Sequence, residues 1–237
     1  MHNVRAIYLK ELRSYFNSPM AYIFLVLFAL LNAYFFTTTF FLMGQSDMRA
    51  LFGVVPLVYL FFVPAISMSL IAREKSLGTV EIIATLPIED IELVVGKYLA
   101  AVTLIAAGLL FTAVHFFTLV SVGTSIDYGA ALLGYFGLLL VGAFYAAIGT
   151  FASSVTENQV VSLIVALVFV LAFFLMDKML IFVPTTLAGI LQYLSVDYHL
   201  SNISRGVMDS RNLVYFASMI WLFLALTLRV IDIRKWR

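Results

Sequence analysis

Six apolar stretches, each about twenty residues long, run through this 237-residue chain, and each is long enough to cross a lipid bilayer as an α-helix. Charged residues make up 11% of the chain, against roughly 25% in ordinary globular domains. We therefore expect an all-α polytopic membrane protein with a single transmembrane domain over residues 1–237. The spans are predicted near residues 20–43, 51–72, 97–121, 130–152, 159–177 and 213–231.

Several classes of function lack the residues that they need. The chain has no cysteine, which removes disulfides, thiolate metal sites and cysteine nucleophiles, and its net charge of +1 gives no field that would attract nucleic acid. The Gly96-Lys97 pair lacks the other residues of a phosphate-binding loop, and neither a HExxH nor a GxSxG motif occurs. We therefore expect no catalytic, cofactor or metal site here, and any ATP and Mg to be bound by another polypeptide.

The distribution of Lys and Arg predicts the orientation, because loops on the cytoplasmic side carry an excess of positive charge. Four of the fourteen, Arg49, Lys178, Arg205 and Arg211, fall on one side if both termini share the other. We expect a multi-pass protein of the bacterial cytoplasmic (inner) membrane, with both termini and segment 73–96 in the cytoplasm.

Residues 1–18 are predicted to form an interfacial helix along the membrane surface. Its apolar side carries Val4, Ile7, Tyr8, Leu12, Tyr15 and Phe16. Lys10 and Arg13 lie at the edge or opposite, where basic side chains reach the headgroups of membrane lipid. Glu11 falls within the apolar arc. It has a partner on a neighbouring loop or contacts a second subunit, and we favour the loop.

Segment 73–96 holds the densest block of charge. Gly78 is predicted to end the preceding helix in the left-handed conformation. Thr79 can then cap a short helix that ends near Leu86, because Pro87 disfavours helical geometry in the residue before it. So short a helix is not stable alone and needs a partner surface. Glu89, Asp90 and Glu92 are expected in the first turn of the next helix.

Three spans have features of their own. Pro56 and Pro64 predict a kink in the second. Small residues every four positions in the fourth, among them Gly142, favour close packing within one subunit over a dimer seam. The fifth is expected to begin with a capping box, either Thr156 with Gln159 or Ser154 with Glu157. Thr156, Glu157 and Gln159 would form a second, smaller cytoplasmic contact.

The 178–212 segment is expected outside the cytoplasm, as short re-entrant or interfacial helices. His199, Arg205 and Asp209 are its candidate gate residues. A metal cluster of His199 with its neighbouring aspartates is less favoured than polar residues in a wet loop. His115, alone on the third span, is interpreted as a buried, hydrogen-bonded residue rather than a proton relay.

The chain resembles type-2 ABC transporter permeases, and most of all their gliding-motility-type branch. The similarity covers nearly the whole chain and rests on KELRSYFNSP, REKSLGTVEIIATLPIEDIELVVGKYLA, SSVTENQVVS and HLSNISRGVMDSRNLVYF. Asn212 departs from the pattern, which has an acidic residue there.

The resemblance implies that a second permease copy, or a related permease, pairs with cytoplasmic ABC ATPase subunits. It makes Thr79–Leu86 a coupling helix, in which Val80, Ile83 and Leu86 enter a groove of the ATPase. Glu74, Glu81 and Glu89 would pair with basic residues of the ATPase. The acidic side chains would set its orientation more than its affinity.

Three functions remain open on this evidence. The first is the permease of an exporter. The second is a membrane module that transmits ATPase strokes to a cell-surface machine, such as a gliding-type apparatus with a periplasmic auxiliary protein. The third is an intramembrane enzyme or channel that needs no ATPase. Intramembrane acidic residues suited to ion coupling are lacking, which argues against a secondary transporter.

Overall fold

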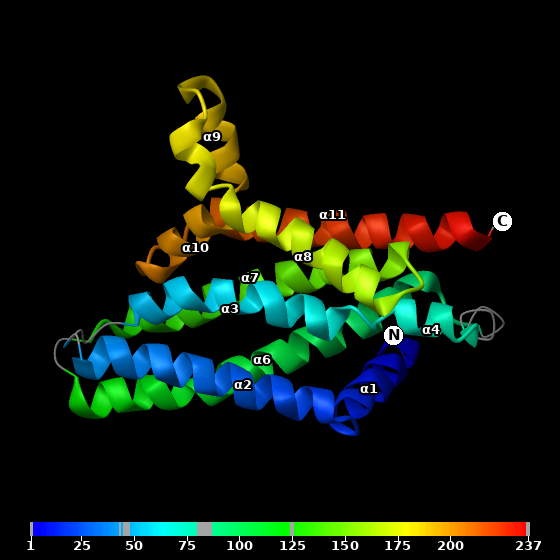
Figure 1. The fold of residues 1–237 in the computed structure, drawn as a ribbon, viewed down its shortest axis with the longest axis horizontal. Helices are drawn as coiled ribbons and strands as arrows, with labels where there is room; N and C mark the ends of the chain where they lie inside the picture. Colours follow the sequence, from blue (N-terminus) through cyan, green and yellow to red (C-terminus); the bar gives the residue numbers. More distant parts are fainter. Residues whose placement is uncertain (1, 43, 45–47, 80–86, 124–125, 236–237) are drawn as a thin grey trace.

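The computed structural model describes residues 2–42, 44, 48–79, 87–123 and 126–235, and these form helices joined by turns, with no strand among them (Figure 1). The all-α class is confirmed. The helices are α1 His2–Phe16, α2 Pro19–Thr37, the π-helix η1 Thr38–Leu42, α3 Arg49–Ser67, α4 Ala72–Ser76, α6 Asp90–Val122, α7 Tyr128–Val155, α8 Gln159–Leu175, the 3-10 helix η2 Lys178–Phe182, α9 Thr185–Leu194, α10 Val196–Ser204 and α11 Ser210–Lys235.

Five helical stretches are long and apolar enough to cross a membrane: Pro19–Leu42, Leu51–Ser76, Asp90–Val122, Tyr128–Val155 and Ser210–Ile233. Their length and composition are those of membrane-spanning helices. Helix α8 is equally apolar but has 17 residues.

Helix α7 is the centre of the bundle, in contact with α3, α6, α8, α10 and α11. Its small residues allow this close approach. A Cβ on Gly142 would lie 2.7 Å from Ile105 Cγ2, and one on Gly149 would lie 1.8 Å from Ser67 Oγ. Elements of the same chain therefore cover the small-residue face, which confirms the prediction of packing within one subunit.

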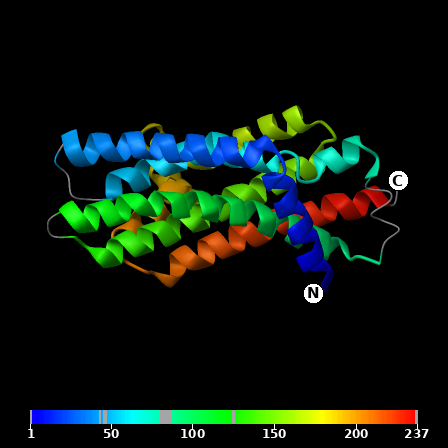
Figure 2. The ribbon, with the colours of Figure 1, turned by 90° about the horizontal axis from the view of Figure 1, so that it is seen from below.

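Helix α1 lies across one end of the bundle, at an angle to the long helices (Figure 2). The N- and C-termini lie near this same end, and so does α4 (Figure 1). The end of α6, the start of α7 and helix α10 lie toward the opposite end (Figure 1). Helix α9 projects sideways from the bundle (Figure 1).

Both prolines of the second span lie within α3, and the kink expected from them stays a prediction. The chain turns at residues 68–71, between α3 and α4. Neighbouring α7 supplies side-chain partners at this break, as described below.

The start of α6 lies at the predicted acidic turn, whereas α8 begins with a different cap from those predicted. Helix α6 begins at Asp90, a full turn and more before the predicted span, because Glu89 and Glu92 form a capping box. The acidic first turn is confirmed. Helix α8 begins at Gln159, but its N-cap is Asn158, whose Oδ1 accepts from the backbone N of Val160 at 2.9 Å. The predicted caps were wrong.

Candidate functional site

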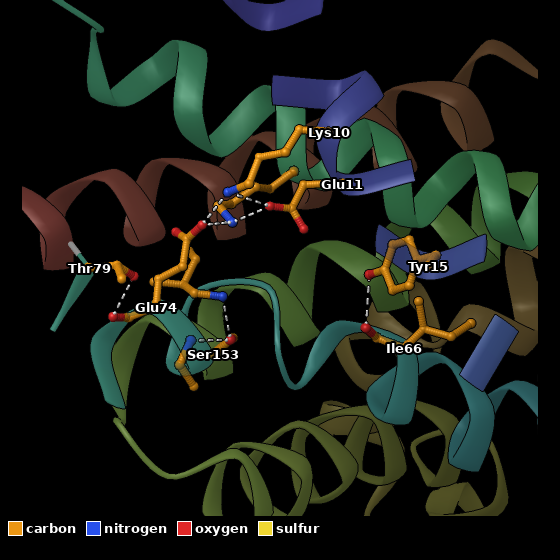
Figure 3. Close-up of polar contacts among 10 residues, drawn as sticks. Lys10, Glu11, Tyr15, Ile66, Glu74, Thr79 and Ser153 are labelled. Carbon is orange, nitrogen blue, oxygen red and sulfur yellow. Dashed lines mark hydrogen bonds and ion pairs between the residues drawn. The ribbon is translucent and has the colours of Figure 1, made fainter. Parts of the chain in front are cut away.

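Four charged side chains from three helices meet where α1 crosses the bundle (Figure 3). Lys97 Nζ of α6 lies 2.8 Å from Glu11 Oε1 of α1 and 2.9 Å from Glu74 Oε1 of α4. Lys10 Nζ lies 2.9 Å from the same Glu74 oxygen and 3.5 Å from Glu11 Oε1. We call these four residues the charge network. It joins α1, α4 and α6.

The charge network is shielded from solvent at its centre. The Lys97 side chain is 1% exposed, and those of Glu11 and Glu74 are 14% and 13% exposed. A buried cation is tolerated when carboxylates surround it closely, and here two do. Burial lowers the pKa of the Lys10 ammonium, but the hydrogen bond and charge of Glu74, aided by Glu11, outweigh this effect and raise the pKa. Lys10 is therefore held as a cation.

The break between α3 and α4 is closed by one hydroxyl of α7. Ser153 Oγ accepts from the backbone N of Ile71 and of Ala72, both at 2.9 Å, and donates to the carbonyl O of Met68 at 2.9 Å. Figure 3 shows Ser153 on the side of α4 away from Lys10 and Glu11. Backbone groups that a continuous helix would have paired thus find partners in the neighbouring helix.

Helix α4 is also bound to α7 through a buried lysine. Lys75, which is 9% exposed, donates from Nζ to the carbonyl O of Ser154 near the C-terminal end of α7. A lysine there meets the negative end of the α7 dipole. The five residues of α4 are therefore fastened to α7 on one side and to the charge network on the other.

The chain leaves α4 as the sequence predicted. Gly78 has a φ of +69°, which confirms its left-handed conformation. Thr79 Oγ1 donates to the carbonyl O of Glu74 at 3.2 Å. The Thr79 hydroxyl therefore closes the end of α4.

Helix α1 packs tightly on the first half of α6. A Cβ on Gly96 would lie 2.8 Å from Ile7 Cγ2 and 3.1 Å from Val4 O. Position 96 therefore has no room for a side chain, and α1 packs directly against the backbone of α6. Asn3 Nδ2 donates to Glu92 Oε2 at 2.8 Å, which fixes the start of α1 to the start of α6.

The far end of α1 is tied to α3. Tyr15 Oη donates to the carbonyl O of Ile66 at 2.9 Å, and the ring is 6% exposed (Figure 3). Burial raises the pKa of this phenol. In a continuous helix this carbonyl would pair with the backbone N of Leu70, but Leu70 N donates to the carbonyl O of Ser67 at 3.2 Å, so the Ile66 carbonyl takes an outside partner. Helix α1 thus contacts both sides of the α3–α4 break.

The charge network borders a cavity of about 380 Å³ between α1 and α4. Tyr15, Ser69, Leu77 and Thr79 also line it, together with Arg73. Within the described part of the chain the carboxylates and lysines that line the cavity pair with one another, which is the arrangement of a joint between helices.

Several predicted coupling residues have other partners or fall outside the described part of the chain. Glu74 pairs with Lys10 and Lys97 of its own chain. Glu89 is the N-cap of α6 and is exposed. Val80, Glu81, Ile83 and Leu86 lie outside the described residues.

Glu11 has an intramolecular partner, as favoured, but that partner is Lys97 on a long helix rather than a loop residue. Among the interfacial residues predicted with it, Lys10 joins the charge network and Arg13 is exposed.

The residues of the second predicted contact lie in the turn between α7 and α8, beside α4. Thr156 is the C-cap of α7 and its Oγ1 accepts from Asn158 N at 3.1 Å, Glu157 is exposed, and Gln159 opens α8. Helix α4 contacts both α7 and α8. The turn between α7 and α8 therefore belongs to the same end of the bundle as the charge network.

The three candidate gate residues differ in their exposure and in their contacts. His199 is fully buried rather than in a wet loop, and its ring is stacked on Tyr215 with centroids 3.9 Å apart. Arg205 is exposed, and Asp209 Oδ1 accepts from Arg211 N at 2.9 Å at the start of α11. Among the residues that the structure describes, no three of His, Asp or Glu gather in a metal-binding group.

The hydrogen bonds of His199 indicate its tautomer. Nε2 lies 2.8 Å from the carbonyl O of Tyr193, an acceptor, and Nδ1 lies 2.8 Å from Oδ1 of Asn212. Within the described part of the chain Asn212 Nδ2 is buried without a partner. If the amide O and N of Asn212 are exchanged, Asn212 Nδ2 donates to Nδ1 of a neutral His199. The buried amide nitrogen then has a partner. His199 is therefore a link from α10 to α11.

His115 is half-buried in α6, and its ring is stacked on Phe36 of α2 with centroids 4.7 Å apart. In the described ranges it has no hydrogen-bond partner, so the hydrogen bond expected for it is not found there.

Two residues of the site were not predicted from the sequence. Ser153 and Lys97 appeared in quoted motifs but received no role. Lys97 could have been predicted, because it is the eighth residue of a helix that starts at Asp90. A lysine at such a position needs a partner if it is buried. For Ser153 there was none, because its partners lie more than 80 positions away.

The family model for ABC-2 family transporter proteins matches residues 5–230, a range that includes the charge network, Ser153 and His199. No curated protein matches the chain.

Proposed function

The chain belongs to the ABC-2 family of transporter proteins, and from this premise we propose that it is the permease subunit of an exporter in the bacterial inner membrane. Members of this family are typically non-catalytic membrane subunits that work with a separate ABC ATPase. The ATPase would bind ATP and Mg, and a second copy of this chain or a related permease would complete the transport unit.

The arrangement of the termini supports a six-span topology. Both termini lie at one end of the bundle (Figure 1), which requires an even number of crossings. The five long helices together with α8 provide six. The excess of Lys and Arg predicted for the end that holds the termini makes it the cytoplasmic one.

The observation that carries the proposal is the fastening of α4. Residues 79–86 follow α4 after Leu77 and Gly78, and α4 is bound to α1 and α6 through the charge network and to α7 through Ser153 and Lys75. A push on residues 79–86 would therefore reach three helices through paired, buried contacts. Packed elements of this kind move as units rather than deform.

Within this proposal the predicted residues take distinct roles. Val80, Ile83 and Leu86 anchor residues 79–86 in a groove of the ATPase, and Glu81 and Glu89 orient it. Glu74, whose charge is balanced by two lysines of its own chain, holds α4 in place. Thr156, Glu157 and Gln159 form a second contact beside α4.

At the opposite end, Arg205 and Asp209 are the proposed outer gate, and His199 keeps α10 on α11. The motifs quoted above resemble those of the gliding-motility-type branch, and this resemblance supports a periplasmic auxiliary protein as a further partner. The alternative function is transmission of ATPase strokes to a cell-surface machine. ATPase activity in liposomes that rises on adding a transported ligand supports the exporter; activity unchanged by every ligand tested favours the alternative.

The coupling role is tested by the V80D/I83D double variant. The two side chains are three residues apart and share one helix face, and each would lose apolar burial of about 1.5–3 kcal/mol in the groove. We expect the variant to insert and pair normally but to lose the ATPase in a pull-down from detergent.

The matched control is V207D/M208D, which places two aspartates at exposed apolar positions near the opposite end of the bundle. This control is expected to retain the ATPase. Retention at the wild-type level by a stable V80D/I83D variant would remove residues 79–86 from the coupling role.

A further inference from the structure

A second cleft, of about 540 Å³, adjoins the cavity of the charge network between α1 and α4. Its lining residues are basic or neutral and polar: Lys10, Arg13, Ser14, Asn17, Ser18 and Arg73. Four of them also line the cavity of the charge network. We call it the basic cleft.

The basic cleft carries positive charge that the neighbouring carboxylates do not balance. Within the charge network two lysines face two carboxylates, so its formal charges sum to zero. Arg13 and Arg73 are exposed, and in the described part of the chain neither guanidinium has an ion-pair or hydrogen-bond partner. Two guanidinium groups thus leave a formal charge of +2 at the cleft.

The donors of the basic cleft suit a phosphate group. A guanidinium presents paired N–H groups that match two phosphate oxygens. Ser14 and Asn17 line the same cleft, and their side chains have no hydrogen bond within the described ranges, so a hydroxyl and an amide are free to donate. A phosphate bound here would contact α1 and α4 together.

The position of the basic cleft points to a lipid as the source of the phosphate. Its lining residues at the N-terminal side end at Ser18, and the span α2 begins at the next residue, Pro19. Just beyond, Tyr22 and Ile23 are 55% and 56% exposed and begin an apolar outer face that continues along α2 to Leu30, which is 61% exposed. Acyl chains can pack on this face while the headgroup reaches the cleft.

We propose that the basic cleft binds the phosphate of an anionic phospholipid whose acyl chains lie along α2. The bound phosphate bridges α1 and α4 beside the charge network and so strengthens the joint between them. This inference does not depend on the presence of an ATPase.

The test uses the full chain in neutral detergent, with lipid binding measured by native mass spectrometry. Phosphatidylglycerol is the anionic probe, and phosphatidylcholine with the same acyl chains is the zwitterionic comparison. The R13Q/R73Q variant removes both free guanidinium groups. Since each basic side chain near an anionic headgroup contributes a factor of about five, we expect phosphatidylglycerol affinity to fall about thirtyfold, with little change for phosphatidylcholine.

The matched control is R5Q/R229Q, which removes two exposed arginines outside the cleft. It should keep its phosphatidylglycerol affinity within about twofold, and thermal unfolding should show both variants folded. Equal losses in the two variants, or wild-type binding by R13Q/R73Q, would overturn the proposal. Displacement of the lipid by millimolar inorganic phosphate would assign the cleft to free phosphate instead. An R13Q/R73Q variant that keeps the lipid but loses the ATPase would make the arginines part of a protein interface.

Discussion

Lys97 shows how a single residue can decide the arrangement of a membrane bundle. Its side chain is 1% exposed, and an unpaired ammonium at that depth would be expensive to bury. Glu11 and Glu74 lie within 2.9 Å of its Nζ, each from a different helix. The position of one cation therefore determines where α1 and α4 are held relative to α6.

The K97M substitution should destabilise the protein by about 3–5 kcal/mol, because it leaves two largely buried carboxylates with less positive charge. Thermal unfolding in detergent, followed by circular dichroism, measures the loss. The double variant K97M/E11Q should recover part of it, since Glu74 keeps Lys10 and Glu11 is neutralised. An unchanged midpoint for K97M would show that the charge network contributes nothing to the joint.

At the scale of elements, α1 and α4 depend on their neighbours more than on their own sequences. Helix α4 has five residues, too few to be stable alone, and both of its faces are held by other helices. Helix α1 has an apolar side, as its periodicity predicted, but α6 and α3 cover part of that side. The interfacial helix is therefore also a packed element of the bundle.

The G96A substitution tests the contact between α1 and α6. An added Cβ would meet Ile7 Cβ at 2.9 Å and Val4 O at 3.1 Å, and the backbone oxygen cannot swing aside. We expect α1 to shift and stability to fall by about 1–3 kcal/mol in a thermal melt.

The control for G96A is G53A, because a Cβ on Gly53 in α3 meets nothing within 4 Å. Replacing glycine by alanine in an open helix position should leave stability unchanged or raise it slightly. Equal melting temperatures for G96A and wild type would contradict the close approach of α1 to α6.

On the scale of the whole molecule, the charge network and the candidate gate lie toward opposite ends of one bundle. Helix α7 spans the distance between them. Its residues reach from a contact with α10 to the Ser153 contact with α4. Motion of α4 therefore has a continuous, buried path along α7 to α10 and α11.

Cysteine labelling in this cysteine-free chain tests the topology. Ser76, Met179 and Val207 are exposed and suit single substitutions. An impermeant reagent added to intact cells should label M179C and V207C but not S76C, which should react only after the membrane is opened. Labelling of S76C from outside would reverse the orientation. Labelling of M179C and V207C from opposite sides would show that the segment between them crosses the membrane.

What the sequence by itself determined is the set of local structures. Apolar runs of sufficient length predict helices because a buried backbone must pair within its own segment. Gly78 and the acidic turn at Glu89 likewise mark where helices end and begin, since capping involves neighbours only. The all-α class, the presence of long apolar helices and the packing role of Gly142 followed from such patterns.

Tertiary structure alone decided which side chains meet. Glu11 and Lys97 are 86 positions apart, and Ile71 and Ser153 are 82 apart, so no periodicity relates them. His199 looked like a wet-loop residue because its sequence neighbours are polar, yet Tyr193 and Tyr215 enclose it. A helical pattern records which face is apolar, whereas ion pairs and buried hydrogen bonds depend on how the helices are rotated and placed against one another.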